Sequence, residues 1–429
     1  MYFSTVELNT TASQCVNSFL LLLIILKTGS VMLLRASLRQ PLCHFIWKRT
    51  KTTSSVNYIK ALVSEDCLEI EWNDGHKSRF HNSWLRFSCQ CEHCKQSHSG
   101  QRTIDTLSIP EPLEISDFSL SKNKENLEVK WENERDHQGV LNLQWLRENC
   151  YSEVARKLDN KRRKTQPHIG EHSLPEVEYS TIMESREGLW KMLSQLSDHG
   201  VSLVKNVPHD DEENVLKVGR LIGPIQETIY GKMFDVVSTP NPINIAYSSV
   251  GLSYHIDLAY YESPPGLQLL HCLRFDSDIE GGESLFLDAF YVAEEFRKQF
   301  PKEFDDLVRI PGTFQKIHFE RDYPVKLVYK RPHIVLSPDK EIVAVTWAPP
   351  FEGPLSVPEK SVRLHQGDLV CFNNRRILHG RNSFNLNGGV RHFKGAYVNI
   401  DEFRNAFQVT SELVGSGEPC RRSGNHCFL

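Results

Sequence analysis

The hydrophobic pattern from about residue 179 onward consists of short apolar runs separated by turns rich in glycine and proline. Strands are predicted at residues 201–204, 267–273, 284–287, 341–345, 362–364 and 369–374. The spacing of apolar residues predicts helices at residues 188–196, 214–222 and 292–298. Many short strands with turns between them are typical of a jelly roll. The predicted fold class is therefore mainly β with flanking helices, and its larger domain is a double-stranded β-helix.

A degenerate repeat lies earlier in the chain, between about residues 58 and 150. In each copy an alternating strand is followed by Trp-Leu-Arg and then by Cys. In the first copy these are residues 68–72, 84–86 and 89, and in the second they are residues 127–131, 145–147 and 150. Each copy is predicted to form a short hairpin followed by a turn or helix, with its tryptophans and leucines in a core. Residues 58–150 are therefore predicted to form a small β-rich domain.

Polar segments mark the predicted domain boundaries. Residues 151–178 are highly charged and contain Pro167 and Pro175, which is typical of a helix end followed by a linker. The larger domain is predicted to cover residues 179–410. The end of the chain is polar and rich in Gly, Ser and Cys, so residues 411–429 are predicted to form a loose tail.

Residues 1–57 have the composition of a targeting segment. The apolar run at 18–26 is long enough for the core of a signal peptide but short for a membrane span. Between Leu8 and Ser64 the chain has no Asp or Glu, while Lys and Arg are scattered among Ser, Thr and Leu. This second pattern is typical of a mitochondrial presequence. We therefore predict a mitochondrial protein without a membrane span in its mature form. The alternatives are secretion, a single membrane anchor and a cytoplasmic location.

Charge and cysteine content narrow the possible functions. The chain has 429 residues and a net charge of −4. Residues 1–60 carry seven Lys or Arg and one Glu, a net charge of +6, so the rest of the chain carries −10. An acidic body argues against a nucleic-acid-binding protein. The 11 cysteines are odd in number, which favours a metal site or free thiols over a disulfide framework.

Three of these cysteines form a tight cluster. Cys89, Cys91 and Cys94 place three thiols within six residues, a spacing that suits a tetrahedral zinc ion. Four ligands would leave no position for water, so such a site would be structural rather than catalytic. Buried free thiols are the alternative interpretation.

Four histidines are candidates for the remaining ligand. His93 lies inside the cluster loop, where the geometry disfavours it, and His98 follows closely. His76 and His137 occupy nearly matching places in the two copies of the repeat. We prefer His137, because a metal bound by this residue would connect the two copies.

Two short clusters far apart in the chain carry the strongest chemical signal. In the predicted strand at 253–258, alternation places His255 and Asp257 on the same face, and His379 follows another predicted strand. Two imidazoles and one carboxylate can bind one face of an octahedral metal and leave the other face open, as in non-haem Fe(II) oxygenases. Arg391, about a dozen residues later, can bind a carboxylate through two hydrogen bonds. These residues predict an iron enzyme with a dicarboxylate co-substrate, and the alternative is a set of structural histidines.

Together these motifs resemble the family of γ-butyrobetaine dioxygenase and trimethyllysine dioxygenase, and the former more closely. The resemblance covers about residues 58–405 and rests on Cys89-x-Cys91-x-x-Cys94, Tyr254–Asp257, Pro264–Cys272, Gly281-Gly282 with Asp288, Leu378–Arg381 and Arg391–Tyr397. It implies an enzyme of carnitine biosynthesis that uses Fe(II), 2-oxoglutarate and O₂, with ascorbate in support. It also implies a small domain with structural zinc before a catalytic jelly roll, and a homodimer.

The resemblance assigns a role to each candidate residue. The implied residues are, for iron, His255, Asp257 and His379; for 2-oxoglutarate, Arg391; for zinc, Cys89, Cys91, Cys94 and His137; and for the substrate, Tyr230, Phe234, Asn244, Tyr247 and Tyr397. The four aromatic residues would form a cage for a trimethylammonium group, which has no N–H donor and is recognised by aromatic faces and shape. Ordinary core packing is the alternative for them.

The chain departs from the family pattern around the substrate. Leu258 stands where γ-butyrobetaine dioxygenase has a tyrosine that helps to bind the substrate carboxylate, and Phe234 stands where a tryptophan is usual. Residues 346–350 and Arg375 also differ from the family. We predict hydroxylation of γ-butyrobetaine to L-carnitine, with N6,N6,N6-trimethyllysine or another quaternary ammonium acid as the alternative substrate. A non-catalytic jelly-roll binding protein is the third hypothesis.

Overall fold

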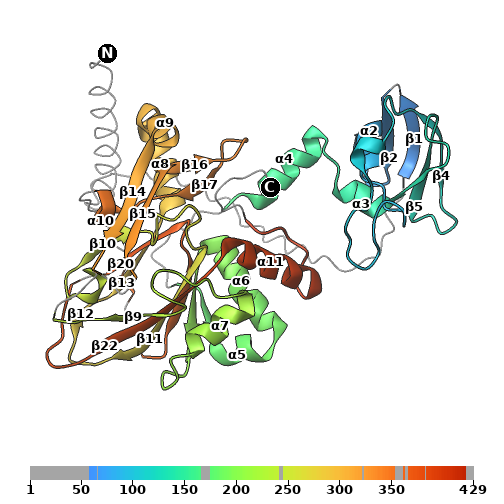
Figure 1. The fold of residues 1–429 in the computed structure, drawn as a ribbon. Coiled ribbons are helices and arrows are strands. Elements are labelled where there is room, and N and C mark those ends of the chain that lie inside the picture. Colours follow the sequence, from blue (N-terminus) through green and yellow to red (C-terminus); the bar gives the residue numbers. More distant parts are fainter. Residues whose placement is uncertain are drawn as a thin grey trace, which may run out of the picture. The chain divides into compact units, whose positions relative to one another are not determined.

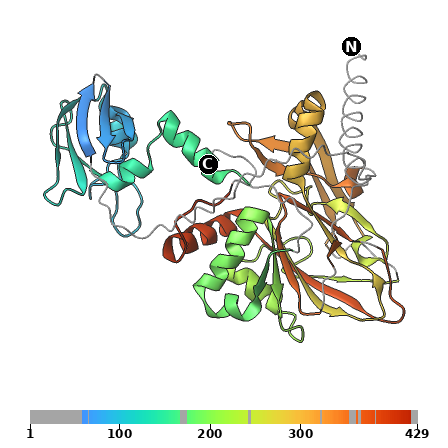
Figure 2. The same cartoon turned by 180° about the vertical axis from the view of Figure 1, so that it is seen from behind.

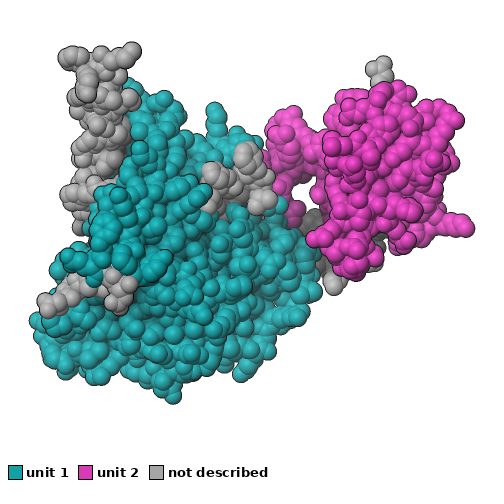
Figure 3. Space-filling model, viewed as in Figure 1, with its two compact units in different colours: residues 1–44, 163–429 teal, residues 45–162 magenta. Residues whose placement is uncertain are grey.

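The structure is a computed structural model that describes residues 58–64, 66–165, 174–240, 245–320, 323–352, 361–362, 366–381 and 383–421. Two compact units divide the chain between Arg162 and Arg163, a smaller one of residues 45–162 and a larger one that includes residues 163–429 (Figure 3). The predicted targeting segment, residues 1–57, lies outside the described residues. No helix in the described ranges is both long and apolar enough to cross a membrane.

The smaller unit contains the predicted repeat as two similar three-stranded antiparallel sheets, each followed by a short helix. The first copy consists of β1 (Tyr58–Ser64), β2 (Cys67–Trp72), β3 (Lys77–His81) and α2 (Asn82–Phe87), and the second of β4 (Ile115–Leu120), β5 (Asn126–Trp131), β6 (Gln138–Asn142) and α3 (Leu143–Glu148). A short 3₁₀ turn, η1 (Thr106–Ser108), lies between them. Trp72 and Trp131 are buried at equivalent positions of the two copies. Trp84 and Trp145, also equivalent, stack with ring centroids 5.5 Å apart, so the two copies share one core.

The described residues of the predicted linker at 151–178 include a helix and a strand. Helix α4 (Glu153–Arg163) begins it, and β7 (Glu176–Glu178) pairs in parallel with β8 (Val201–Lys205) in the larger unit. Val177 is buried between two exposed glutamates, the alternation expected of a sheet edge. The predicted start of the larger domain at residue 179 was therefore wrong, because β7 already belongs to its sheet.

Two sheets form the jelly roll of the larger unit (Figures 1 and 2). The six-stranded sheet has the order β7, β8, β19 (Leu369–Asn373), β11 (Leu267–Phe275), β22 (Arg391–Val398) and β9 (Phe234–Val237). The four-stranded sheet has the order β10 (Leu252–His255), β20 (Ile377–Arg381), β13 (Ser284–Asp288) and β18 (Ser361–Val362). The smaller pairs are β12 (Glu280–Gly281) with β21 (Phe384–Asn385), β14 (Pro311–His318) with β15 (Val325–Pro332), and β16 (Ile334–Leu336) with β17 (Ile342–Val345). The predicted mainly β fold is confirmed.

Helices cover the outer face of the six-stranded sheet. The helices of the larger unit are α5 (Tyr179–Glu184), α6 (Arg186–His199), α7 (Asn214–Ile222), α8 (Ala289–Gln299), α9 (Pro301–Arg309), α10 (Pro349–Glu352) and α11 (Ile400–Leu413), with a 3₁₀ turn η2 (Ile245–Tyr247). Apolar side chains of α6, α7 and α11 pack against the sheet in one core. In β22, Ala396 and Val398 point into this core. The alternate residues Arg391, Phe393 and Tyr397 face a cavity on the other side of the sheet.

The predicted loose tail does not begin at residue 411. Helix α11 continues to Leu413, and Ser411 donates a hydrogen bond to the carbonyl of Glu418. Cys420 is buried in the core that α6 and α11 share, and Arg421 Nε lies 2.9 Å from the carboxylate of Asp198. The prediction was wrong for residues 411–421 because a polar composition conceals these tertiary contacts. Residues 422–429 lie outside the described part of the chain.

Candidate active site and metal centres

The cavity between the two sheets contains most of the predicted catalytic residues. Its lining comes from β10, β13 and β20 on one side, from β9, β11 and β22 on the other, and from the loops between them. The lining residues are Tyr230, Phe234, Val236, Ile245, Ala246, Tyr247, Leu252, His255, Asp257, Leu258, Tyr260, Gln268, Leu270, Ser284, Pro350, His379, Gly380, Arg381, Arg391, Phe393 and Tyr397. The iron, co-substrate and aromatic candidates named from the sequence therefore surround one space.

The three predicted iron ligands meet at this cavity. His255 and His379 are paired across β10 and β20, with ring centroids 4.5 Å apart. Asp257 places one carboxylate oxygen 3.5 Å from Nε2 of His255 and the other 3.9 Å from Nε2 of His379. One ligand atom from each residue lies within 4.8 Å of the other two. The carbonyl of Ser253 lies 2.8 Å from Nδ1 of His255, which leaves Nε2 free to bind a metal.

The backbone around Asp257 differs from the predicted strand. β10 ends at His255, and Leu258 adopts the left-handed conformation with φ of 57°. Asn374, which is fully buried, takes the place of a neighbouring strand. Its side-chain oxygen accepts from the backbone N–H of Asp257, and its amide donates to the carbonyl of Asp257. Alternation therefore placed His255 and Asp257 together correctly, but a turn held by Asn374 produces the geometry.

The protonation states of the three residues suit a divalent cation. Burial alone would raise the pKa of Asp257, but the two imidazoles and the Tyr397 hydroxyl hold it well below its usual range. Burial and the neighbouring His255 lower the pKa of His379 to about 3, so this imidazole is neutral. Burial lowers the pKa of His255, but the neighbouring Asp257 outweighs it and the pKa is raised overall, so metal binding here competes with protonation. Two imidazoles and an anionic carboxylate fit Fe(II).

Tyr397 orients the carboxylate of Asp257, which leads to a first prediction. Its hydroxyl donates to Oδ2 of Asp257 over 2.9 Å. Tyr397→Phe keeps the ring and removes this bond, so Fe(II) or Co(II) affinity is expected to fall by about 10- to 100-fold. Titration of the purified variant with Co(II), followed by its d–d absorption, measures the change. An affinity equal to that of the wild type would refute the orienting role.

Arg391 is a buried cation that faces the same cavity. Its guanidinium lies 4.1 Å from the ring centroid of Phe393, and a carbonyl, that of Gly282, accepts one of its hydrogens over 3.4 Å. No carboxylate of the described chain forms a salt bridge with it. Burial and the nearby Arg381 lower the pKa of Arg391 to about 9, so it still carries a charge at pH 7. A buried cation without an anionic partner is costly, which suits it to binding a carboxylate of a co-substrate.

The predicted aromatic residues line the cavity beside the metal ligands. Phe234 and Tyr397 stack with centroids 5.1 Å apart, and Tyr230 lies 6.3 Å from Phe234. Gly395, opposite Phe234 on β22, makes room for the ring, because a Cβ there would overlap it. Tyr247 lines the cavity from η2. The predicted Asn244 lies outside the described residues.

Two aromatic residues of the cavity lining, Tyr260 and Phe393, were not predicted as site residues from the sequence. Tyr260 is buried, and its hydroxyl lies 3.5 Å from that of Tyr230. Its position three residues after Asp257 was the available signal. Leu258, also buried in the lining, presents an apolar surface immediately beside the metal carboxylate.

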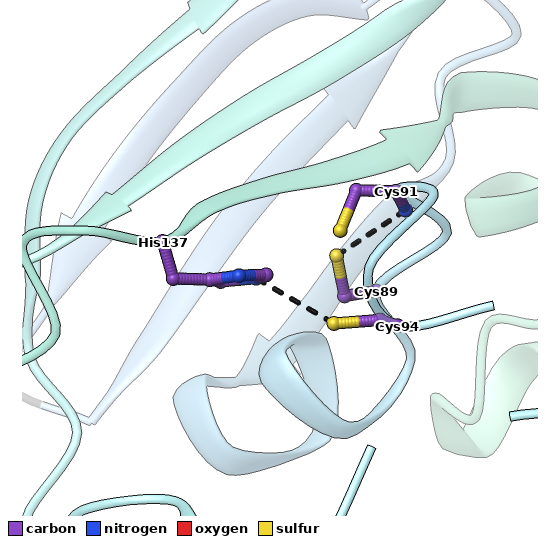
Figure 4. Close-up of side chains that lie close together, drawn as sticks. All are labelled: Cys89, Cys91, Cys94 and His137. Atoms are coloured by element: carbon purple, nitrogen blue, oxygen red, sulfur yellow. Dashed lines mark hydrogen bonds between the residues drawn. The ribbon is translucent and has the colours of Figure 1, made fainter. Parts of the chain in front are cut away.

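The cysteine cluster forms a second centre in the smaller unit. Cys89, Cys91, Cys94 and His137 point toward one another from the cluster loop and the β5–β6 turn (Figure 4), with all ligand atoms within 4.8 Å. Nε2 of His137 lies 3.8 Å from the sulfur of Cys94. Burial and the neighbouring thiols raise the pKa of Cys94 to about 12, so a bound metal would have to displace protons from this group. Three thiols and one imidazole within this distance fit a tetrahedral zinc ion.

The other histidine candidates lie elsewhere. Nε2 of His76 lies 3.2 Å from the sulfur of Cys150, the equivalent of Cys89 in the second copy. Arg147 binds Asp74 there, as Arg86 binds Glu134 beside the cluster. His76 therefore lies beside Cys150, at the position in the repeat that corresponds to that of His137 beside the cysteine cluster. Neither His93 nor His98 joins the four-residue group in the described chain.

Comparisons with known proteins agree with this geometry. The family described as taurine catabolism dioxygenase TauD, TfdA family matches residues 161–355, and the family described as gamma-butyrobetaine hydroxylase-like, N-terminal matches residues 59–124. Gamma-butyrobetaine dioxygenase of Pseudomonas sp. is 29% identical over 78% of this chain and 91% of its own length. Trimethyllysine dioxygenase of Meyerozyma guilliermondii is 28% identical over 80% and 94%, and mitochondrial trimethyllysine dioxygenase of Mus musculus is 29% identical over 82% and 86%. These identities do not separate the two kinds of relative.

Proposed function

We propose that this chain is a member of the family of Fe(II)- and 2-oxoglutarate-dependent dioxygenases that includes γ-butyrobetaine dioxygenase and trimethyllysine dioxygenase, and that it hydroxylates γ-butyrobetaine to L-carnitine. The observation that carries the proposal is the composition of one cavity. Two imidazoles, one carboxylate, a buried arginine and several aromatic rings surround the same space.

The iron and co-substrate roles follow from the ligand chemistry. His255, Asp257 and His379 would bind Fe(II), and Arg391 would bind a carboxylate of 2-oxoglutarate. Together iron and 2-oxoglutarate supply the activation of O₂ that hydroxylates an unactivated C–H bond. The protein positions the reactants, because hydroxylation at one carbon requires that carbon to be held close to the metal. Tyr397 keeps the Asp257 carboxylate in the orientation that the metal needs.

The aromatic rings supply recognition for a trimethylammonium group. Tyr230, Phe234 and Tyr247 lie in the cavity lining beside Tyr397. A quaternary ammonium cannot donate hydrogen bonds, so ring faces and a close fit are what bind it. The cation would then lie against the rings while the rest of the molecule extends along the cavity toward the metal ligands.

The charge of the lining favours γ-butyrobetaine over trimethyllysine. Among the described lining residues, Asp257 is the only carboxylate, and the lining also contains two arginines, Arg381 and Arg391. With neutral imidazoles these residues contribute a net +1, and the charges of Fe(II) and 2-oxoglutarate cancel. A zwitterion without net charge enters such a cavity more easily than trimethyllysine, which carries an additional ammonium group. No described carboxylate of the lining remains free to bind that ammonium.

A substrate comparison tests this proposal. Purified protein is supplied with Fe(II), ascorbate and 2-oxoglutarate, and succinate release is measured with γ-butyrobetaine and with trimethyllysine. We expect γ-butyrobetaine to stimulate release more strongly. Equal or stronger stimulation by trimethyllysine would overturn the substrate assignment. Stimulation by neither would overturn the assignment to quaternary ammonium acids.

We also propose zinc for the cysteine cluster and a homodimer in solution. The mass of the purified protein in solution tests the homodimer.

We further propose a mitochondrial location. Residues 8–64 contain Lys and Arg but no Asp or Glu, which supports this location, as does the name of the mouse relative. Labelling the C-terminus of the protein and imaging it in cells tests the location.

A further inference from the structure

Arg381 is a buried cation whose role the iron and co-substrate sites do not explain. It lies on β20, two residues after His379, and only 5% of it is exposed. Its guanidinium stacks over Phe384, with 4.7 Å to the ring centroid. Within the described residues, its guanidinium forms no salt bridge with a carboxylate and bonds to backbone carbonyls. The charge is instead directed at the backbone of another segment.

That segment is the loop of residues 245–250. The guanidinium donates to the carbonyl oxygens of Ala246, Ser248 and Val250, over 3.2, 2.6 and 3.0 Å. The two carbonyls between them are also bonded: that of Tyr247 accepts from the backbone N–H of Thr239, and that of Ser249 from Phe384. Five consecutive carbonyls thus accept hydrogen bonds, three of them from the single side chain of Arg381.

The loop forms a wall of the cavity that is exposed to solvent on its other side. Ile245 is 50% exposed, and Val250 is 56% exposed. Ile245, Ala246 and Tyr247 nevertheless line the cavity. The side chains at both ends of the loop are about half exposed, so the hydrogen bonds to the carbonyls between them contribute to its position. Arg381 connects it directly to the strand that carries a metal ligand.

We propose that Arg381 is a positioning residue that holds the 245–250 loop against β20 and so fixes the wall that contacts the substrate. This inference rests on the proposed function, since it assigns the loop to recognition of the quaternary ammonium substrate. Charged hydrogen bonds are the stronger class, and no other residue type presents a planar fork to three separate carbonyls. Arg381 thereby fixes the position of Tyr247 relative to β20, the strand that carries His379.

The test compares Arg381→Met and Arg381→Lys with the wild type. We expect Arg381→Met to raise KM for γ-butyrobetaine by about tenfold or more, because three carbonyls lose a charged partner. KM for 2-oxoglutarate and the affinity for Co(II) should stay within about twofold, because both depend on other residues. Less hydroxylated product should form per succinate released. Arg381→Lys should recover part of the loss, since it keeps the charge but has no planar fork.

Hydrogen exchange gives a readout that does not depend on the activity. In the protein without metal, the amides of residues 245–250 should exchange faster in Arg381→Met, while those of β22 should be unchanged. The matched control is Arg274→Met, which removes an exposed arginine that binds Asp276. It should alter neither KM nor exchange in the loop.

Three outcomes would overturn the inference. Unchanged exchange in the loop would show that Arg381 does not hold it. An equal rise in KM for γ-butyrobetaine and for 2-oxoglutarate would indicate that Arg381 binds 2-oxoglutarate rather than positioning the loop. If the loop exchanges faster in Arg381→Met but KM for γ-butyrobetaine equals that of the wild type, the loop does not contribute to substrate recognition. If the wild type hydroxylates neither γ-butyrobetaine nor trimethyllysine, the proposed function fails, while the exchange result still decides whether Arg381 holds the loop.

Discussion

Replacing His255 with alanine is expected to abolish hydroxylation and to remove tight binding of Fe(II). Loss of an outer partner of a metal ligand costs about 10- to 100-fold in affinity, so loss of a ligand costs more than about 100-fold. The carboxylate of Asp257 loses one of its two imidazole neighbours at the same time, and only His379 would remain beside it. Two ligands hold a divalent metal poorly. Co(II) titration and succinate release together measure the effect.

The control for this change is His209→Ala, which removes an exposed histidine outside the cavity. It should retain wild-type Co(II) affinity and turnover. Circular dichroism should show both variants folded, because the large apolar cores of the unit are unchanged. Substantial turnover by a folded His255→Ala protein would contradict the assignment of the metal ligands. Retained Co(II) binding without turnover would instead give His255 a role other than that of a metal ligand.

The sequence predicted those parts of the site that depend on local periodicity. At residues 253–258, alternation placed His255 and Asp257 on the same side, and the structure brings both to one cavity. The Cys-x-Cys-x-x-Cys spacing likewise identified three neighbouring thiols before any fold was known. His137 could be preferred from the repeat, because a metal bound by this residue and the three cysteines would connect the two copies. Each of these signals is contained within one segment or one repeat.

Other parts depend on contacts between distant segments and had no local signal. Asn374 bonds to the backbone of Asp257 across 117 residues of sequence, and this turn replaces the predicted strand. The left-handed conformation of Leu258 belongs to the same turn, and leucine has no intrinsic preference for it. Arg381 reaches loop carbonyls more than 130 residues earlier in the chain. Tertiary contacts therefore determine the backbone conformation of the candidate metal site. Periodicity in the sequence indicates only which of its side chains lie on the same side of a strand.

Replacing Cys91 with serine is expected to release zinc and to destabilise the smaller unit without removing iron from the larger one. Metal binding to structural zinc sites contributes about 10–16 kcal/mol in zinc-finger peptides. This unit also has an apolar core that includes Trp72 and Trp131, so only part of such a contribution is needed for folding. A loss of several kcal/mol lowers Tm by more than about 10 °C, because 1 kcal/mol corresponds to about 4–8 °C in a domain of this size. Calorimetry with parallel zinc analysis measures both effects.

The matched control for the zinc site is His93→Ala, which removes the histidine between Cys91 and Cys94. His93 is exposed and is not one of the four clustered ligands, so zinc content and Tm should match the wild type. His137→Ala should behave like Cys91→Ser, because a closed site needs all four ligands. If His93→Ala loses zinc and His137→Ala retains it, the fourth ligand is His93 and not His137. Full zinc content and an unchanged Tm in Cys91→Ser would show that the thiols of this cluster do not form a metal site.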